Sequence, residues 1–135
     1  MSNFVKLDDD IYFDYIKKLW LKSSDEINQF SKIKDFKYIH IIQPNQYLKG
    51  SKIISNDELD FLKYEKYGKP ISKYYKDIKV EDLEVKYKLD LRYIFKDNDM
   101  TLYRDYCCHL NNKGMFLMAS EIVNQFSYLF KETLE

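Results

Sequence analysis

The run over residues 38–42 is the feature that most constrains how this chain can fold. It reads YIHII, a nearly continuous apolar stretch, and Gln43 and Pro44 end it. A strand with one wet face alternates apolar and polar residues, whereas a parallel strand buried on both faces reads as an almost unbroken apolar run. We therefore expect a buried parallel strand over residues 38–42.

A long helix is predicted before this strand. The acidic residues Asp8, Asp9 and Asp10 suit the positive end of a helix dipole, and the pattern continues over residues 7–36, with Ser23-Ser24 as a candidate break. A helix followed by a buried strand and a polar loop predicts a layered α/β fold. The apolar residues near the 3.6-residue period are expected to form the core stripe: Ile16, Leu19, Trp20, Ile27, Phe30 and Ile33.

A shorter helix is predicted after the polar loop. Residues 55–70 offer Asn56 or Asp57 as an N-cap, and Gly68 with Pro70 as the helix end. Residues 71–88 are ambiguous and are predicted as a loop with a short helix.

The C-terminal part predicts a second strand and a last helix. Residues 89–95 alternate enough to be a strand, and residues 101–114 read as an extended piece that leads into a loop. Residues 115–134 are amphipathic, with Asn111 or Asn112 as the cap. The predicted buried stripe of this helix is Met115, Met118, Ala119, Ile122, Val123, Phe126, Leu129 and Phe130.

Composition narrows the classes of protein that fit. The chain has 135 residues and a hydrophobic fraction of 45%, which predicts one folded domain over residues 1–135. Basic and acidic residues both number 22, so the sequence predicts no nucleic-acid or anionic-membrane partner. It shows no apolar run long enough to span a membrane and no signal-peptide pattern, so a cytoplasmic location is expected for the sequence as written.

The stretch DYCCH places Asp105, Cys107, Cys108 and His109 together. A structural zinc site needs four ligands from spaced pairs, but His40 is the one other histidine, so no metal is expected. Adjacent cysteines also differ from the Cys-x-x-Cys redox pattern. Two interpretations stay open. The cysteines are packing residues beside a polar helix start, or Asp105 and His109 form an acid–base pair.

The run DYCCHLNNKGMFLMASEI resembles the last conserved block of the SGNH (GDSL-type) esterase superfamily. In that block an Asp, a His, an Asn and a Gly open the C-terminal helix. Three residues separate Asp105 from His109 here, where the usual spacing has two. Upstream, IHIIQPNQYLKGSKIISNDEL is similar to a bacterial subgroup of the same superfamily, and the resemblance covers roughly residues 15–130.

This resemblance implies a partial three-layer, flavodoxin-like α/β fold, corresponding to the C-terminal half of the SGNH domain. It makes His109 the general base and Asp105 the residue that orients it. The Gly-Asp-Ser block that carries the nucleophilic serine, and the Gly-x-Asn-Asp block of the oxyanion hole, do not occur in this sequence. We therefore expect an esterase portion that needs no cofactor, is inactive alone, and acts on acyl esters once a Ser-bearing segment completes it.

Two further expectations concern binding. Gln43, Asn45 and Gln46 follow the buried strand at its carboxyl end, where α/β folds place ligands, so they could line a substrate pocket. Gln43 and Asn45 are the candidate substrate-binding residues, and a plain polar loop is the simpler interpretation. The alternative function is a non-catalytic interaction module, or a truncated remnant, that pairs with another chain through exposed strand edges.

Overall fold

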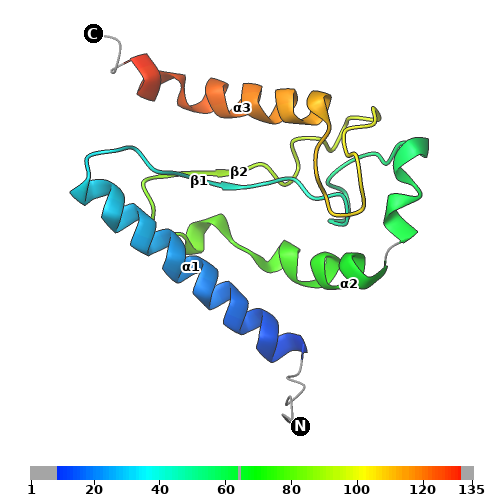
Figure 1. The fold of residues 1–135 in the computed structure, drawn as a ribbon, viewed down its shortest axis with the longest axis horizontal. Coiled ribbons are helices and arrows are strands. Elements are labelled where there is room, and N and C mark those ends of the chain that lie inside the picture. Colours follow the sequence, from blue (N-terminus) through cyan, green and yellow to red (C-terminus); the bar gives the residue numbers. More distant parts are fainter. Residues whose placement is uncertain (1–8, 64, 132–135) are drawn as a thin grey trace.

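The computed structural model describes residues 9–63 and 65–131. Its two longest helices lie near the two ends of the chain, and two short strands lie between them (Figure 1). Four single-turn 3-10 helices, η1 to η4, connect the other elements. The elements in chain order are α1 (Asp9–Ile33), β1 (Ile39–Ile42), η1 (Asn56–Glu58), η2 (Phe61–Lys63), α2 (Glu65–Tyr74), η3 (Tyr75–Asp77), η4 (Val80–Asp82), β2 (Tyr87–Asp90) and α3 (Asn112–Lys131).

The two strands form a parallel pair in the register Ile39 to Tyr87 through Ile42 to Asp90. This confirms a parallel strand close to the predicted residues 38–42, although β1 begins at Ile39 and its Ile39 and Ile41 are only half-buried. α3 lies on one side of the pair, whereas α1 and α2 lie on the other (Figure 1). The protein is therefore a mixed α/β chain with a two-stranded parallel sheet across the described residues.

The strand predicted over residues 89–95 is wrong in its position, because β2 begins at Tyr87 and ends at Asp90. The Asp90 carboxylate turns the chain there. It accepts hydrogen bonds from the Arg92 backbone N–H at 3.0 Å and from the Arg92 guanidinium Nη2 at 2.6 Å. The next residues form a turn closed by the Ile94 N–H on the Leu91 carbonyl.

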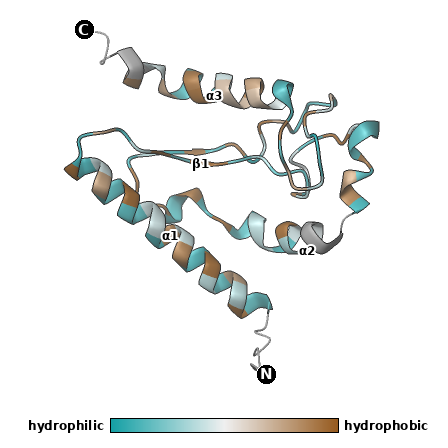
Figure 2. Ribbon diagram, viewed as in Figure 1, coloured by the Kyte–Doolittle hydropathy of each residue, from teal (hydrophilic) through white to brown (hydrophobic). Residues whose placement is uncertain are grey.

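α1 is continuous through Ser23-Ser24, but the predicted core stripe is wrong. The residues that α1 buries are polar: Ser24, Asn28 and Ser31. The predicted stripe faces solvent instead, apart from the half-buried Trp20, and its apolar residues recur along the helix in Figure 2. Their exposed fractions are 39% for Ile16, 42% for Leu19, 45% for Ile27, 52% for Phe30 and 77% for Ile33.

The helix predicted over residues 55–70 is instead η1, η2 and α2, and Ser55 rather than Asn56 or Asp57 is the N-cap of η1. α2 also runs past Gly68 and Pro70 to Tyr74. Gly68 has a packing role in place of the predicted capping role. A Cβ at this position would lie 2.8 Å from Cδ1 of Tyr47, so the missing side chain lets α2 approach the Tyr47 ring.

α3 begins at Asn112, three residues before the predicted start, and Asn111, one of the two predicted caps, is its cap. The Asn111 Oδ1 accepts hydrogen bonds from the backbone N–H groups of Lys113 and Gly114 at 2.9 and 3.0 Å. The predicted stripe is only partly buried. Phe126 and Leu129 are buried, Met118 and Ile122 are half-buried, Met115, Ala119 and Val123 are exposed, and the Phe130 side chain and residues 132–134 lie outside the described part.

His40 explains why α1 turns polar residues toward the sheet. The His40 side chain on β1 is buried, and its Nδ1 lies 2.7 Å from Ser24 Oγ and 2.8 Å from Tyr38 Oη. The Trp20 ring packs edge-on against the imidazole at 4.6 Å between centroids. A buried polar ring needs hydrogen-bond partners, and an apolar stripe facing β1 would supply none.

This environment makes folding pH-dependent. Burial lowers the pKa of His40 below the ordinary histidine value of 6.5. Because the unfolded chain then binds the proton more readily, the stabilisation is complete above the unfolded pKa and is lost as pH falls through the folded pKa. We predict that the urea midpoint falls from pH 7 to pH 5 and that His40→Gln flattens this slope. An unchanged slope in His40→Gln would contradict the assignment.

Candidate functional site

The candidate site lies on the loop that joins the Tyr103 segment to α3. The Arg104 N–H donates to the His109 carbonyl at 2.9 Å, and the Asn111 N–H donates to the Leu102 carbonyl at 2.8 Å. Tyr103 and Leu110 also form an antiparallel bridge. These contacts fold residues 102–111 back on themselves, with the DYCCH stretch at the tip.

Asp105 and His109 meet at this tip. Asp105 Oδ2 lies 2.7 Å from His109 Nδ1, and Asp105 Oδ1 accepts from the backbone N–H groups of Cys107 at 2.8 Å and His109 at 3.3 Å. Nε2 of His109 has no hydrogen-bond partner within the described residues, and 59% of the side chain is exposed. The carboxylate therefore engages one ring nitrogen and leaves the other open to the surface.

The surroundings of Asp105 favour its ionised form over its protonated form. Burial by itself would raise the pKa of Asp105, but the hydrogen bonds from the His109 ring and from the Cys107 and His109 N–H groups outweigh it and lower that pKa. The carboxyl group is therefore ionised at neutral pH, which is the state that accepts a proton-bearing Nδ1.

The polar loop after β1 holds this tip in place. Gln46 Nε2 donates to the Asp105 carbonyl at 2.9 Å, and the Tyr47 hydroxyl lies 2.8 Å from the Tyr106 carbonyl and 2.9 Å from the Phe61 carbonyl. The structure thus brings together the two sequence stretches, QPNQY and DYCCH, that carry the family resemblance. Gln46 was expected only to line a substrate pocket, and Tyr47 was not among the predicted site residues.

Of the two cysteines, Cys108 packs inside the loop, whereas Cys107 does not. Cys108 is buried with a backbone φ of 69°, and it lies against Asn45 and Gln46. Burial raises the pKa of the Cys108 thiol to about 11, so the thiol is neutral and unreactive at pH 7. Cys107 is exposed, and both cysteines are free.

The structure separates the two predicted substrate-binding residues. Gln43 is exposed and lines a cavity of about 620 Å³ that lies between α1, α2 and the end of β1. Asn45 is buried, and its Oδ1 accepts the Tyr47 N–H at 3.0 Å. Asn45 therefore shapes the loop that supports Asp105, whereas Gln43 faces open space on the α1 side of the sheet.

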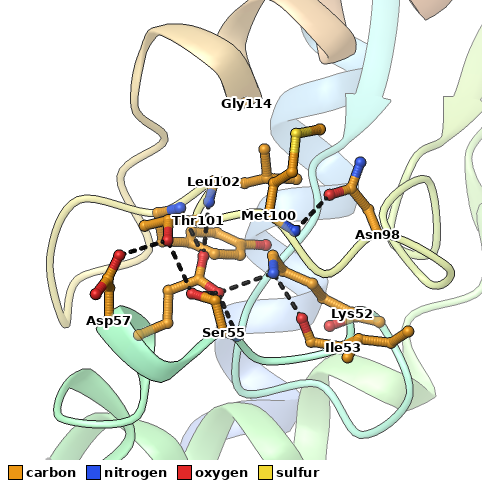
Figure 3. Close-up of polar contacts among 12 residues, drawn as sticks. Lys52, Ile53, Ser55, Asp57, Asn98, Met100, Thr101, Leu102 and Gly114 are labelled. Carbon is orange, nitrogen blue, oxygen red and sulfur yellow. Dashed lines mark hydrogen bonds and ion pairs between the residues drawn. The ribbon is translucent and has the colours of Figure 1, made fainter.

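A buried carboxylate, Glu58, bonds to the segment that leads into the site. Figure 3 shows Lys52, Ser55 and Leu102 close together in this region. The Glu58 Oε1 accepts the backbone N–H groups of Leu102 at 2.8 Å and Tyr103 at 2.9 Å. Its Oε2 lies 2.8 Å from Lys52 Nζ, and the side chains of both charged residues are fully buried. The segment that leads into the Asp105 loop is therefore fixed to the chain after β1.

Sequence reasoning missed Glu58, although a local signal for it exists. The order Ser55-x-x-Glu58 is that of a capping box, and the Glu58 Oε2 does accept the Ser55 N–H at 3.0 Å. The long-range bonds to Leu102 and Tyr103 span more than forty positions, so no local pattern announces them.

Gly114 sets how closely α3 approaches this segment. A Cβ at this position would lie 2.6 Å from the Leu102 carbonyl oxygen, which is a backbone atom that cannot move aside cheaply. The glycine therefore lets the first turn of α3 pack directly on the segment that Glu58 anchors (Figure 3).

Comparison with known proteins finds no match to this chain among protein families, curated proteins or solved structures. Across residues 9–63 and 65–131, no group of three or more His, Cys, Asp or Glu residues is arranged to hold a metal ion. No helix in the same part of the chain combines the length and apolar character needed to cross a membrane.

We predict that Glu58→Gln destabilises the fold by roughly 3–5 kcal/mol, because the substitution leaves the buried Lys52 ammonium without its counter-charge. Urea denaturation measures the loss. The exposed Glu81→Gln is the matched control and should change stability by less than about 0.5 kcal/mol. Equal effects of the two substitutions would contradict the role assigned to Glu58.

We also predict that neutral His109 carries its proton on Nδ1, because the Asp105 carboxylate accepts a hydrogen bond only from a protonated ring nitrogen. Ring ¹⁵N NMR shifts measure the tautomer directly. In Asp105→Asn the preference of the ring proton for Nδ1 over Nε2 should weaken or reverse. Asp57→Asn alters an exposed carboxylate elsewhere and should leave that preference unchanged. A proton on Nε2 in the native protein would contradict the pairing.

Proposed function

We propose that this chain is the Asp–His portion of an SGNH-type serine esterase, which hydrolyses an acyl ester once a Ser-bearing segment completes it. The observation that carries the proposal is the 2.7 Å contact between Asp105 Oδ2 and His109 Nδ1, which leaves Nε2 exposed and without a partner in the described residues. An orienting carboxylate on one ring nitrogen and a free second nitrogen are what a general-base histidine requires.

The proposed chemistry follows from this pair. Nε2 of His109 takes the proton from the incoming serine hydroxyl as the serine oxygen attacks the acyl carbonyl. The same nitrogen then returns the proton to the departing alkoxide, which leaves as an alcohol. Water repeats the two steps on the acyl-serine and releases the acid. Asp105 stays ionised throughout and stabilises the imidazolium, which agrees with its lowered pKa.

The arrangement of elements supports the proposed family. A partial three-layer, flavodoxin-like fold would have parallel strands with helices on both faces, and β1 and β2 are parallel with α3 on one side and α1 and α2 on the other. The loop after β1 and the Asp105 loop meet at the carboxyl end of the strands, through Gln46. That end of a parallel sheet is where α/β folds bind ligands.

Of the predicted substrate contacts, only Gln43 is exposed, and the cavity that it lines includes neither Asp105 nor His109. This cavity of about 620 Å³ is also lined by apolar residues of α1 and α2. Asn45 is buried in its own turn, so it acts on the site by positioning the loop rather than by touching substrate.

The test is hydrolysis of p-nitrophenyl acetate and butyrate. The chain alone should release no p-nitrophenol above the buffer rate, because it offers His109 no serine to deprotonate. A completed assembly, obtained by co-expression with a segment that carries the Gly-Asp-Ser and Gly-x-Asn-Asp blocks, should turn over. Asp105→Asn should then lower kcat by about 10⁴-fold, as the loss of the correct tautomer does in serine hydrolases.

The exposed Cys107→Ala, on the same loop, is the matched control and should keep turnover within a few-fold. Hydrolysis that persists in His109→Ala would overturn the proposal. One observation favours the alternative, a non-catalytic interaction module: the exposed apolar residues of α1 need a cover whether or not catalysis occurs. A stable complex with no turnover would favour that alternative.

A further inference from the structure

One edge of the sheet, on β1, offers unpaired backbone groups. The Leu91 N–H donates to the Ile42 carbonyl at 2.9 Å, so the alternation of a parallel ladder turns the N–H and C=O groups of His40 and Ile42 toward β2. Those of Ile39 and Ile41 then point away from β2. No group within the described residues hydrogen-bonds to the backbone of Ile41 on that side.

The two strands differ in the side chains along their open edges. β2 has the sequence YKLD, and all four of its residues are half-buried. Charged side chains such as Lys88 and Asp90 are how native sheets protect a true edge. β1 has the sequence IHII, in which His40 and Ile42 are buried and Ile39 and Ile41 are half-buried. β1 therefore has the character of an interior strand with one side left open.

Contacts of α1 show where its exposed apolar face lies relative to this edge. Asn28 Nδ2 donates to the Glu84 carbonyl, just before β2, and Ser24 contacts His40 on β1. At about 100° per residue, these positions run around the helix from the β2 side to the β1 side. Continuing around the helix in the same direction reaches Ile27 and Ile16. These two apolar residues therefore lie beyond the open edge of β1.

We infer that the open edge of β1, together with the apolar flank of α1, docks a parallel, apolar β-strand of the Ser-bearing segment. The flank consists of Ile16 and Ile27, which are 39% and 45% exposed. This inference rests on the proposed function and identifies the surface through which the site is completed. The strand would pair with the Ile39 and Ile41 backbone groups, and its side chains on one face would cover the flank.

The strand of the Ser-bearing segment would run parallel to β1, and this direction distinguishes it from a second copy of the chain. β1 ends at Ile42, and four residues later Gln46 holds the Asp105 carbonyl, so the carboxyl end of β1 leads to the site. A parallel strand also ends on that side, and it would bring the following residues toward His109. Two copies related by a two-fold axis would pair their β1 edges antiparallel and deliver nothing to His109.

The probe is a capped peptide with a Val-Ile-Val-Ile-Val core and two lysines at each end, bearing a nitroxide at either terminus. Added to the full chain, it should slow hydrogen exchange at the Ile41 amide and leave that of Ile42 unchanged. The C-terminal nitroxide should broaden the His109 ring signals more than the N-terminal one. A peptide with proline at the central position is the negative control, because proline removes a ladder donor.

Ile27→Lys tests the flank with little risk to folding, because Ile27 is 45% exposed. It should weaken peptide binding by about tenfold or more, since it places a charge where apolar contacts form. Gln29→Lys adds the same charge on the exposed, polar side of α1 and should change binding by less than about twofold.

Three outcomes would overturn the inference. They are no protection of Ile41 up to the solubility limit of the peptide, stronger broadening from the N-terminal nitroxide, and a concentration-dependent dimer that itself protects Ile41. The proposed function fails separately. If the peptide docks in parallel but a completed assembly never hydrolyses ester, the function is wrong and the surface stands. If an assembly hydrolyses ester while Ile41 stays unprotected, the surface is wrong and the function stands.

Discussion

The described part of the structure depends most on one buried ion pair, between Glu58 and Lys52. Both side chains are fully buried, and the Glu58 carboxylate also satisfies the N–H groups of Leu102 and Tyr103, which would otherwise be buried without acceptors. Moving two charges out of water costs free energy. The Glu58 carboxylate offsets this cost because it accepts hydrogen bonds of good geometry from the Lys52 ammonium and from both backbone N–H groups. Through this group the chain after β1 fixes the segment that carries Asp105 and His109.

The candidate site is positioned by packing rather than by a rigid sheet. Three contacts from the loop after β1 support the DYCCH tip: Gln46 on the Asp105 carbonyl, Tyr47 on the Tyr106 carbonyl, and the Asn45–Gln46 stretch against Cys108. Two glycines make room for this arrangement, since Gly68 admits the Tyr47 ring and Gly114 admits the Leu102 carbonyl. A pair that orients a proton must be held within a narrow range of geometry, and these supports supply that restraint.

The failure of the α1 stripe as a core prediction has a clear physical cause. Periodicity showed an amphipathic helix and placed its apolar residues correctly on one face. It assumed that the apolar face meets the sheet. In the structure Ser24, Asn28 and Ser31 meet it, because His40 and the Glu84 carbonyl on the sheet side need polar partners. Of the apolar face, Ile27 and Ile16 lie on the β1 side of the helix, whereas Leu19 and Phe30 point away from the sheet.

Local chemistry in the sequence was sufficient for several features: the long first helix, the apolar parallel strand, Asn111 as the cap of α3, and the closeness of Asp105 to His109. Each of these features depends on residues that lie at most a few positions apart. Their conformational preferences and local hydrogen bonds do not require contacts with the rest of the chain. Only the tertiary structure decided that Glu58 anchors Leu102 and Tyr103, that Gln46 and Tyr47 hold the site, and which face of α1 is buried. Those contacts join residues about 15 to 60 positions apart, and such pairings depend on how the elements pack, which no local pattern encodes.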